Sequence, residues 1–239
     1  MTFSFKFCYN AYLPIMLKTE IFDRPRAYNK VEALMLELID AGQFLYSRSL
    51  LPATSGNLSL RYPENNSVVI TRSGQCKGRL SMQDFLEIDL NGFPINTNKV
   101  PSAETLLHTQ LYQFSSDINA VYHVHSINSV VISKLIGAGK ELRLQNYELL
   151  KALSGVDTHA HTEIIPIFKN TQNIKLLAAE VEQYLKVAPD THAYLIEGHG
   201  IYSWGTDSKE ALRHLEAIET LIEIELSLRG AKRRDNLVE

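Results

Sequence analysis

The chain has 239 residues, of which 45% are hydrophobic and 21% charged. This composition is typical of an ordinary globular protein and excludes a disordered chain or a coiled coil. The formal net charge is −3, and no run of lysine or arginine is long enough to follow a phosphate backbone, so nucleic acid is not an expected partner. Two cysteines, Cys8 and Cys76, provide no disulfide framework for a domain of this size, which favours a reducing cytoplasm.

The first residues are apolar but do not have the pattern of a membrane segment. Asn10 and Pro14 interrupt them well short of the ~20 apolar residues that a spanning helix needs, and no small-residue cleavage site follows. We therefore expect no membrane association. Residues 1–25 are expected to be an N-terminal extension, either disordered or preceding a true start at Met16, and residues 26–239 to form one domain.

The first half of the chain predicts a helix followed by a hairpin, a strand and a second helix. Apolar residues recur at helical spacing between residues 26 and 49, and polar turn residues then separate short alternating segments. A second helix is expected to begin at Ser102, with Glu104 in its first turn. The expected ranges are helix 26–49, strands 58–61 and 68–71 with a turn at 63–66, and strand 85–89.

The second half predicts strands interspersed with helices and a long C-terminal helix capped by Asp207 or Ser208. Hairpins are expected at both ends of the chain. This order favours a three-layer α/β/α fold with a central, mainly antiparallel sheet over a doubly wound parallel sheet. The expected ranges are strands 120–124, 164–168, 193–196 and 201–204, and helices 126–136, 147–153 and 174–185.

Two histidines stand one residue apart at the end of a predicted strand. On an extended segment, His123 and His125 project from the same side. Such a pair is suited to zinc, which accepts imidazole nitrogen at about 2.0 to 2.1 Å. Two histidines on a strand can equally be surface residues or pack against a helix.

A third histidine lies in a predicted tight turn. His199 stands between Gly198 and Gly200 directly after an apolar strand, where the glycines allow the backbone to bend sharply. An ordinary hairpin turn is the alternative reading. Three imidazoles would match a catalytic metal site with a position open for substrate, rather than a closed site with four ligands.

Two carboxylates are candidates for proton transfer, since a general base needs only reach and a suitable pKa. Glu104 could instead complement the dipole of its helix, and Glu148 could be a solvent-facing helix residue. Loops 54–57 and 71–74 each place a hydroxyl beside a glycine at a strand boundary. Together with Ser102, these loops could bind an anion through hydroxyl and backbone N–H groups.

Read together, six motifs resemble the class II aldolase/adducin family, in the family's order and over about residues 26–229. They are SGNLS at 55–59, ITRSG at 70–74, PSAETLLH at 101–108, AVYHVHS at 120–126, YELLKAL at 147–153 and IEGHGIYSWG at 196–205. The resemblance implies an α/β/α sandwich that assembles as a homotetramer, with active sites at subunit interfaces. It also implies one zinc ion per subunit.

The resemblance assigns roles to particular residues. It implies that the metal ligands are His123, His125 and His199, and that Glu104 is an acid/base group. The residues that it implies for binding the substrate phosphate are Gly56, Asn57, Ser73, Gly74 and Ser102. His159, His161 and His192 belong to none of the motifs and are expected not to be ligands.

Finer features resemble those members of the family that are lyases of methionine salvage. These are KGRL after ITRSG, IPIFKNTQNI at 165–174 and the RHLEA helix, and the resemblance places an acid/base glutamate at Glu148. Val124 stands between the two histidines where threonine is more usual, but its side chain points away from the metal. The expected reaction is zinc-dependent dehydration of 5-methylthioribulose 1-phosphate to 5-methylthio-2,3-dioxopentyl phosphate.

Two other functions remain open. An aldolase acting on fuculose or rhamnulose 1-phosphate, or an epimerase of ribulose 5-phosphate, would use the same three histidines. An adducin-like interaction domain would keep the fold without the chemistry. The intact histidines and both carboxylates argue against the interaction domain, since such a module needs no open metal site.

Overall fold

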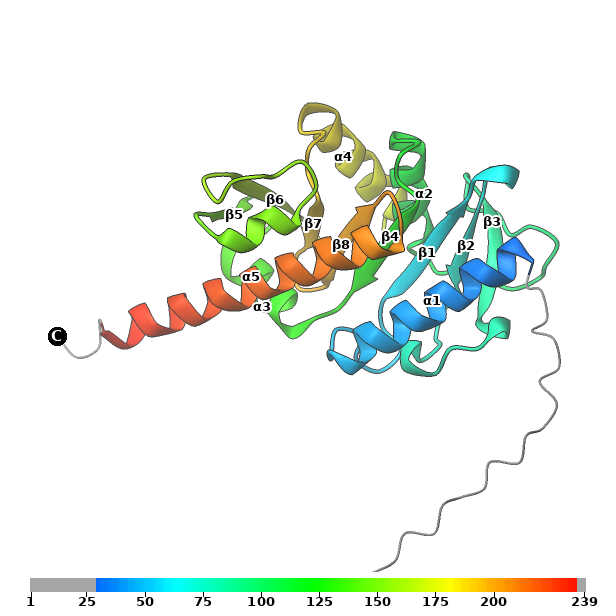
Figure 1. Ribbon diagram of the computed structural model, residues 1–239, viewed down its shortest axis with the longest axis horizontal. Helices are drawn as coiled ribbons and strands as arrows, with labels where there is room; N and C mark the ends of the chain where they lie inside the picture. Colours follow the sequence, from blue (N-terminus) through cyan, green and yellow to red (C-terminus); the bar gives the residue numbers. More distant parts are fainter. Residues whose placement is uncertain (1–28, 236–239) are drawn as a thin grey trace, which may run out of the picture.

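The structure is a computed structural model that describes residues 29–235. The extension expected over residues 1–25, including Cys8 and Met16, lies outside the described residues. Eight strands form one sheet, in the order β3-β2-β1-β4-β8-β7-β6-β5 (Figure 1). The strands are β1 (Asn57–Tyr62), β2 (Ser67–Thr71), β3 (Phe85–Asp89), β4 (Ala120–Val124), β5 (Glu141–Gln145), β6 (Thr162–Phe168), β7 (Ala193–Ile196) and β8 (Gly200–Gly205).

Helices cover both faces of the sheet. The helices are α1 (Lys30–Ser47), α2 (Thr105–Phe114), α3 (Ile127–Ile136), α4 (Ile174–Val187) and α5 (Ser208–Asp235), with short 3-10 turns η1 (Pro63–Asn65), η2 (Lys77–Arg79), η3 (Met82–Asp84) and η4 (Glu148–Ala152). None of the described helices is long and apolar enough to span a membrane.

The sheet is mainly antiparallel, as the sequence predicted. β6 and β7 pair in parallel, with Ile167 opposite Leu195, and the other neighbouring pairs of described strands are antiparallel. α1, α3 and α5 pack together on one face, whereas α2 and α4 pack against each other on the opposite face (Figure 1). The expected three-layer α/β/α sandwich is therefore confirmed.

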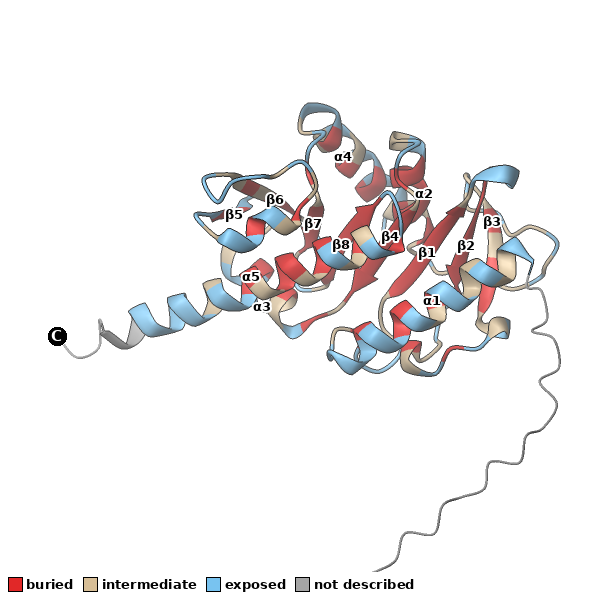
Figure 2. Cartoon of the chain, in the orientation of Figure 1, coloured by how far each residue is buried: buried red, intermediate tan, exposed pale blue. Residues whose placement is uncertain are grey.

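Each face of the sheet has its own hydrophobic core. Leu38 of α1 and Leu215 of α5 belong to one core, whereas Leu107 of α2 and Val181 of α4 belong to the other. Figure 2 shows the strands as mostly buried, the outer surfaces of the helices as exposed, and the C-terminal part of α5 as exposed beyond the body of the molecule. Strands covered on both sides explain the nearly continuous apolar runs of β2, β4 and β7.

The structure differs from the local predictions at three places. α2 begins at Thr105 rather than at Ser102, because the chain before it forms a turn in which the Ser102 carbonyl accepts hydrogen bonds from the Thr105 backbone N–H and hydroxyl. The helical segment predicted over residues 147–153 is present, but it is the short 3-10 helix η4 over residues 148–152. β5 was not predicted, although its residues alternate between exposed and buried as in a half-buried strand.

Candidate metal centre

Three strand ends bring the predicted ligands together. Asn57 at the start of β1 lies directly opposite His123 of β4, and β4 ends just before His125. The turn between β7 and β8 carries His199 to the same place, since Tyr202 of β8 pairs with His123. Residues far apart in the sequence thus meet through the register of three adjacent strands.

The three imidazoles converge on one point. The Nε2 atoms lie 2.8 Å apart for His125 and His123, 3.1 Å for His199 and His125, and 3.4 Å for His123 and His199. Nitrogens bound to one tetrahedral zinc ion at its usual bond length would be about 3.3 Å apart. With Glu104, they form a group of four ligand atoms all within 4.8 Å of one another. The donor set therefore fits a divalent metal ion of borderline softness.

The protonation states also favour metal binding. The His123 Nδ1 atom lies 3.0 Å from the Ile201 carbonyl oxygen, which can only accept, so Nδ1 carries the proton and Nε2 keeps a lone pair facing the cluster. Burial lowers the pKa of His123 well below its usual value. Burial, reinforced by the nearby His199, lowers the pKa of His125 to about 4. Both rings are therefore neutral at pH 7, the form that ligates a metal.

Glu104 lies beside the imidazoles as an ionised carboxylate. Its oxygens lie 2.9 Å from His199 Nε2 and 3.5 Å from His123 Nε2, and Asn57 donates a hydrogen bond of 2.8 Å from Nδ2. Burial alone would raise the pKa of Glu104, but the hydrogen bond from His199 and the electrostatic interactions with His123 and His199 outweigh it, so the net pKa is lowered. The carboxylate can therefore either ligate a metal or accept a proton.

Behind Asn57, a chain of buried hydrogen bonds runs into the core. His108 Nε2 contacts the Asn57 side-chain oxygen, His108 Nδ1 lies 2.7 Å from the Ser59 hydroxyl, and that hydroxyl lies 2.7 Å from the Tyr112 hydroxyl. Burial lowers the pKa of His108 to about 3, so the ring is neutral. With Nε2 as the donor to Asn57, this arrangement fixes the amide so that its nitrogen faces Glu104.

Two glycines make the close approach of these strands possible. A Cβ atom on Gly56, whose φ is +73°, would lie 2.5 Å from the His123 carbonyl oxygen. A Cβ atom on Gly200 would lie 2.1 Å from the Val124 carbonyl oxygen. Any side chain at either position would force apart the strands that carry the histidines.

A polar cavity of about 170 Å³ opens beside the cluster. It is lined by all five residues that the sequence suggested for phosphate binding: Gly56, Asn57, Ser73, Gly74 and Ser102. Glu104 and His125 lie on its wall, so a ligand in the cavity would reach the metal-binding cluster. Lys77 and Arg72 also line the cavity, although they were not among the residues predicted from the sequence to bind the phosphate.

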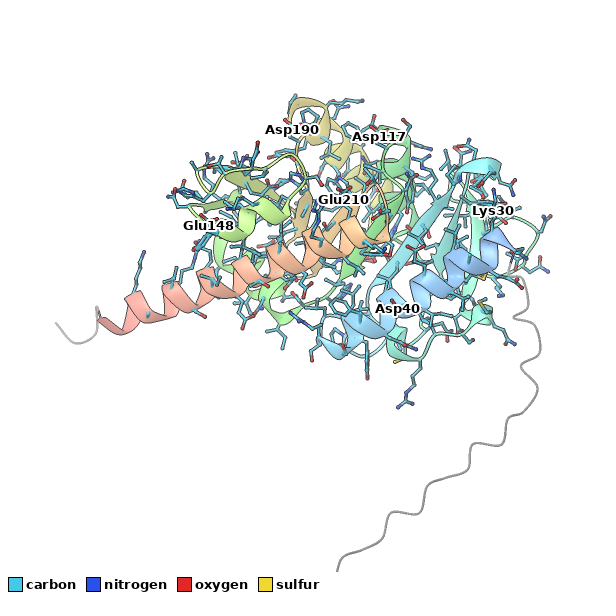
Figure 3. The ribbon with its side chains drawn as sticks, viewed as in Figure 1. Lys30, Asp40, Asp117, Glu148, Asp190 and Glu210 are labelled. Atoms are coloured by element: carbon cyan, nitrogen blue, oxygen red, sulfur yellow. The ribbon has the colours of Figure 1, made fainter. Side chains whose placement is uncertain are left out.

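The second predicted acid/base residue lies elsewhere in the chain. Glu148 is on the surface in η4 (Figure 3). Its side chain is 70% exposed and pairs with Lys151 and His159. It contacts no member of the cluster within the described chain. Its pKa is lowered, chiefly by the hydrogen bond from Lys151.

The other candidate histidines have local partners away from the cluster. His161 and His192 both bind the buried carboxylate of Glu163, at 3.0 Å and 3.1 Å. His159 is exposed and lies 3.5 Å from Glu148. None of the three is part of the four-residue group formed by the ligand candidates.

This fold and this cluster define the chain as a member of the class II aldolase/adducin family. The sequence profile of the Class II Aldolase and Adducin N-terminal domain matches residues 36–226. The same residues include the three histidines, Glu104 and the whole sheet. The family expected from the motifs is therefore confirmed.

The most similar curated proteins include methylthioribulose-1-phosphate dehydratases. That of Pseudomonas paraeruginosa is 48% identical over 202 residues, covering 84% of this chain and 98% of the relative. Those of Pseudomonas syringae and Marinobacter nauticus are 47% and 45% identical, covering 85% and 82% of this chain and 98% and 94% of the relatives.

Solved structures share the fold at lower identity. L-fuculose-1-phosphate aldolase from Thermus thermophilus superposes with a TM-score of 0.68 at 25% identity, covering 84% of this chain and 96% of its own. A sugar-phosphate aldolase from Thermotoga maritima gives a TM-score of 0.61 at 17% identity, covering 85% and 97% of the two chains, and shows the fold alone.

Proposed function

We propose that this protein is a methylthioribulose-1-phosphate dehydratase of methionine salvage. It would convert 5-methylthioribulose 1-phosphate into 5-methylthio-2,3-dioxopentyl phosphate and water. The observation that carries the proposal is the convergence of three imidazole Nε2 atoms and one carboxylate at the wall of a polar cavity, in a chain 48% identical to a dehydratase over nearly that enzyme's full length. Residues 26–239 would form the catalytic domain, consistent with the profile match over residues 36–226.

We propose one zinc ion per subunit, held by His123, His125 and His199. Neutral imidazoles in a set of three, with one carboxylate beside them, are typical ligands of catalytic zinc. When bound, the metal would supply Lewis acidity to the ketone end of the substrate, which would make the C3 hydrogen easier to remove. Metal analysis of the purified protein tests this assignment.

The chain's own residues position the substrate and move protons. Asn57, Ser73 and Ser102, with the backbone at Gly56 and Gly74, would hold the phosphate on C1 in the polar cavity. Glu104, ionised and beside the cluster, would take the C3 proton. The C4 hydroxyl then leaves as water, and the resulting enol becomes the 2,3-diketone after a proton is added at C4.

The departing C4 hydroxyl needs a proton donor, and Glu148 is the proposed acid. Because Glu148 lies on the surface of its own chain, this role requires the partner's Glu148 to complete the site. The proposed homotetramer would have to supply such a contact. In its support, α3 exposes Ile127, Val131 and Leu135 at four-residue spacing, which forms an apolar stripe that starts two residues after His125.

We propose the cytoplasm as the location, consistent with the free thiol of Cys76 and with a phosphorylated sugar as substrate. The test is incubation of the zinc-loaded protein with 5-methylthioribulose 1-phosphate and, in parallel, with L-fuculose 1-phosphate. Formation of the diketone from the first compound alone supports the proposal. Cleavage of the second compound alone would be consistent with the metal site but would make the protein an aldolase. Bound zinc without turnover of either compound would contradict both the dehydratase and the aldolase assignment.

A further inference from the structure

Lys77 is a buried lysine on the wall of the polar cavity. It lies in η2 and is only 1% exposed, which places it among the largest fully buried side chains of the described protein. Its ammonium donates one hydrogen bond, of 2.6 Å, to the Thr54 carbonyl oxygen. An ammonium has three N–H groups, so two of them have no acceptor among the described residues.

A second cation on the same wall also lacks an acceptor. Arg72 lines the cavity, and its Nε atom is buried without a hydrogen-bond partner. The Ser102 hydroxyl accepts from the Glu104 backbone and from Asn57, and among the described residues its own proton has no acceptor. The cavity is therefore rich in donors and poor in acceptors, which is the pattern expected of an anion site.

No carboxylate among the described residues forms an ion pair with Lys77, although the charge of Glu104 acts on its pKa from a distance. The one carboxylate on the cavity wall is Glu104, whose oxygens are already engaged by His199, His123 and Asn57. A buried ammonium bound only to a carbonyl oxygen is costly to keep charged. Burial accordingly lowers the pKa of Lys77 to about 8, which still leaves it mostly protonated at neutral pH.

We propose that Lys77 binds the phosphate of the substrate directly and is the charged residue by which the site selects a phosphate monoester over the unphosphorylated sugar. This inference rests on the proposed function for the identity of the sugar, but not for the anion itself. A phosphate dianion would accept the two remaining N–H groups of Lys77 and supply the missing counter-charge. The hydrogen bond from Lys77 to Thr54 also connects η2 to loop 54–57, so the ammonium and the loop would contact the same anion.

The test compares three variants. Lys77→Met keeps the length and apolar stem of the buried side chain but removes the charge, whereas Lys77→Arg keeps the charge. Arg79→Met is the matched control, because it removes a cation from the same 3-10 turn at an exposed position outside the cavity. Each protein is assayed for zinc content, for kcat and KM with 5-methylthioribulose 1-phosphate, and for affinity for inorganic phosphate by titration calorimetry.

Charge-assisted hydrogen bonds of this kind change affinity by about ten- to a hundredfold. Lys77→Met is expected to weaken binding of inorganic phosphate and to raise KM by that factor, with kcat much less affected and zinc content unchanged. Lys77→Arg should lose no more than a few-fold, and Arg79→Met should match wild type. A purely structural role would lower zinc content or kcat without separating the Met and Arg variants.

Two results would overturn the inference. One is phosphate affinity and KM in Lys77→Met that match wild type, and the other is an equal loss in Lys77→Met and Lys77→Arg. Should wild type fail to turn over the substrate, the proposed function fails. Calorimetry with inorganic phosphate then still decides the role of Lys77, because it does not depend on catalysis.

Discussion

Glu219 of α5 is a buried carboxyl whose titration should control stability near neutral pH. It is 5% exposed, one of its oxygens accepts a 2.7 Å hydrogen bond from the Ser126 hydroxyl, and the other has no partner. Burial raises the pKa of Glu219 to about 7 from 4.5, with a further contribution from the charge of Glu223. The folded protein therefore binds a proton at Glu219 over a pH range in which the unfolded chain has already released it.

The sign and size of the effect follow from linkage. Because the pKa of Glu219 is about 7 in the folded protein and 4.5 in the unfolded chain, its ionisation lowers the free energy of unfolding by up to about 3 kcal/mol once pH exceeds 7. The contribution of protonated Glu219 to the free energy of unfolding is fully present below about pH 4.5 and is lost as pH rises through 7. Glu219→Gln keeps the shape and the acceptor for Ser126 but cannot ionise, so it should be about 2 to 3 kcal/mol more stable than wild type near pH 9 and nearly equal to it near pH 5.

Urea unfolding of the two proteins, at equal protein concentration and equal metal content, measures this difference. The effects of histidine titration on the free energy of unfolding cancel in this comparison, because both proteins contain the same histidines. The reasoning is refuted when the stability difference between Glu219→Gln and wild type is the same at both pH values. Such a result would mean that the carboxyl ionises in the folded protein as easily as it does in water.

Three further substitutions test the site. His123→Ala should reduce zinc content well below that of wild type, and full zinc content measured by metal analysis would contradict the ligand assignment. Glu148→Gln should bind zinc normally but lose about a hundredfold or more in kcat, while the exposed control Glu180→Gln keeps wild-type kcat; an active Glu148→Gln would remove this residue from the chemistry. Asn57→Asp should raise KM about tenfold or more, because the added carboxylate would repel the substrate phosphate and would stand where the Asn57 nitrogen lies 2.8 Å from Glu104. An unchanged KM would count against phosphate binding in this cavity.

The sequence predicted the fold well because most of its elements are locally encoded. Alternating segments and polar turns indicated β1, β2 and β8 within a residue or two, and Asn29 with Glu32 forms a capping box at the start of α1. β5 was missed although Glu141–Gln145 has the right alternation, because only Leu142 and Leu144 are apolar and the three residues between and beside them are polar and exposed. Edge strands bury one face only, so their apolar signal is weak.

The cluster of three histidines and Glu104 was predictable because its histidines lie in recognisable motifs at strand ends. Lys77 was not selected, since a lysine in a sequence reads as a surface residue and its burial depends on packing against α1. His108 was missed for a similar reason. Its partners Asn57, Ser59 and Tyr112 come from β1 and α2, and only the three-dimensional fold aligns them.

The position of Glu148 shows a different limit of the sequence. The motif around it suggested an acid/base group, and the chain places it on an exposed turn beside Lys151. A residue that works across a subunit contact has no local signal that distinguishes it from an ordinary surface carboxylate. Its role therefore remains a prediction that the variant Glu148→Gln tests.

The central claim is that the zinc-loaded protein removes one water molecule from 5-methylthioribulose 1-phosphate. The most direct measurement is mass spectrometry of the phosphorylated product, combined with proton NMR of the C4 position. The account predicts one phosphorylated product that has lost a single water and carries a methylene group at C4. Recovery of two shorter fragments, or of unchanged substrate in the presence of bound zinc, would contradict it.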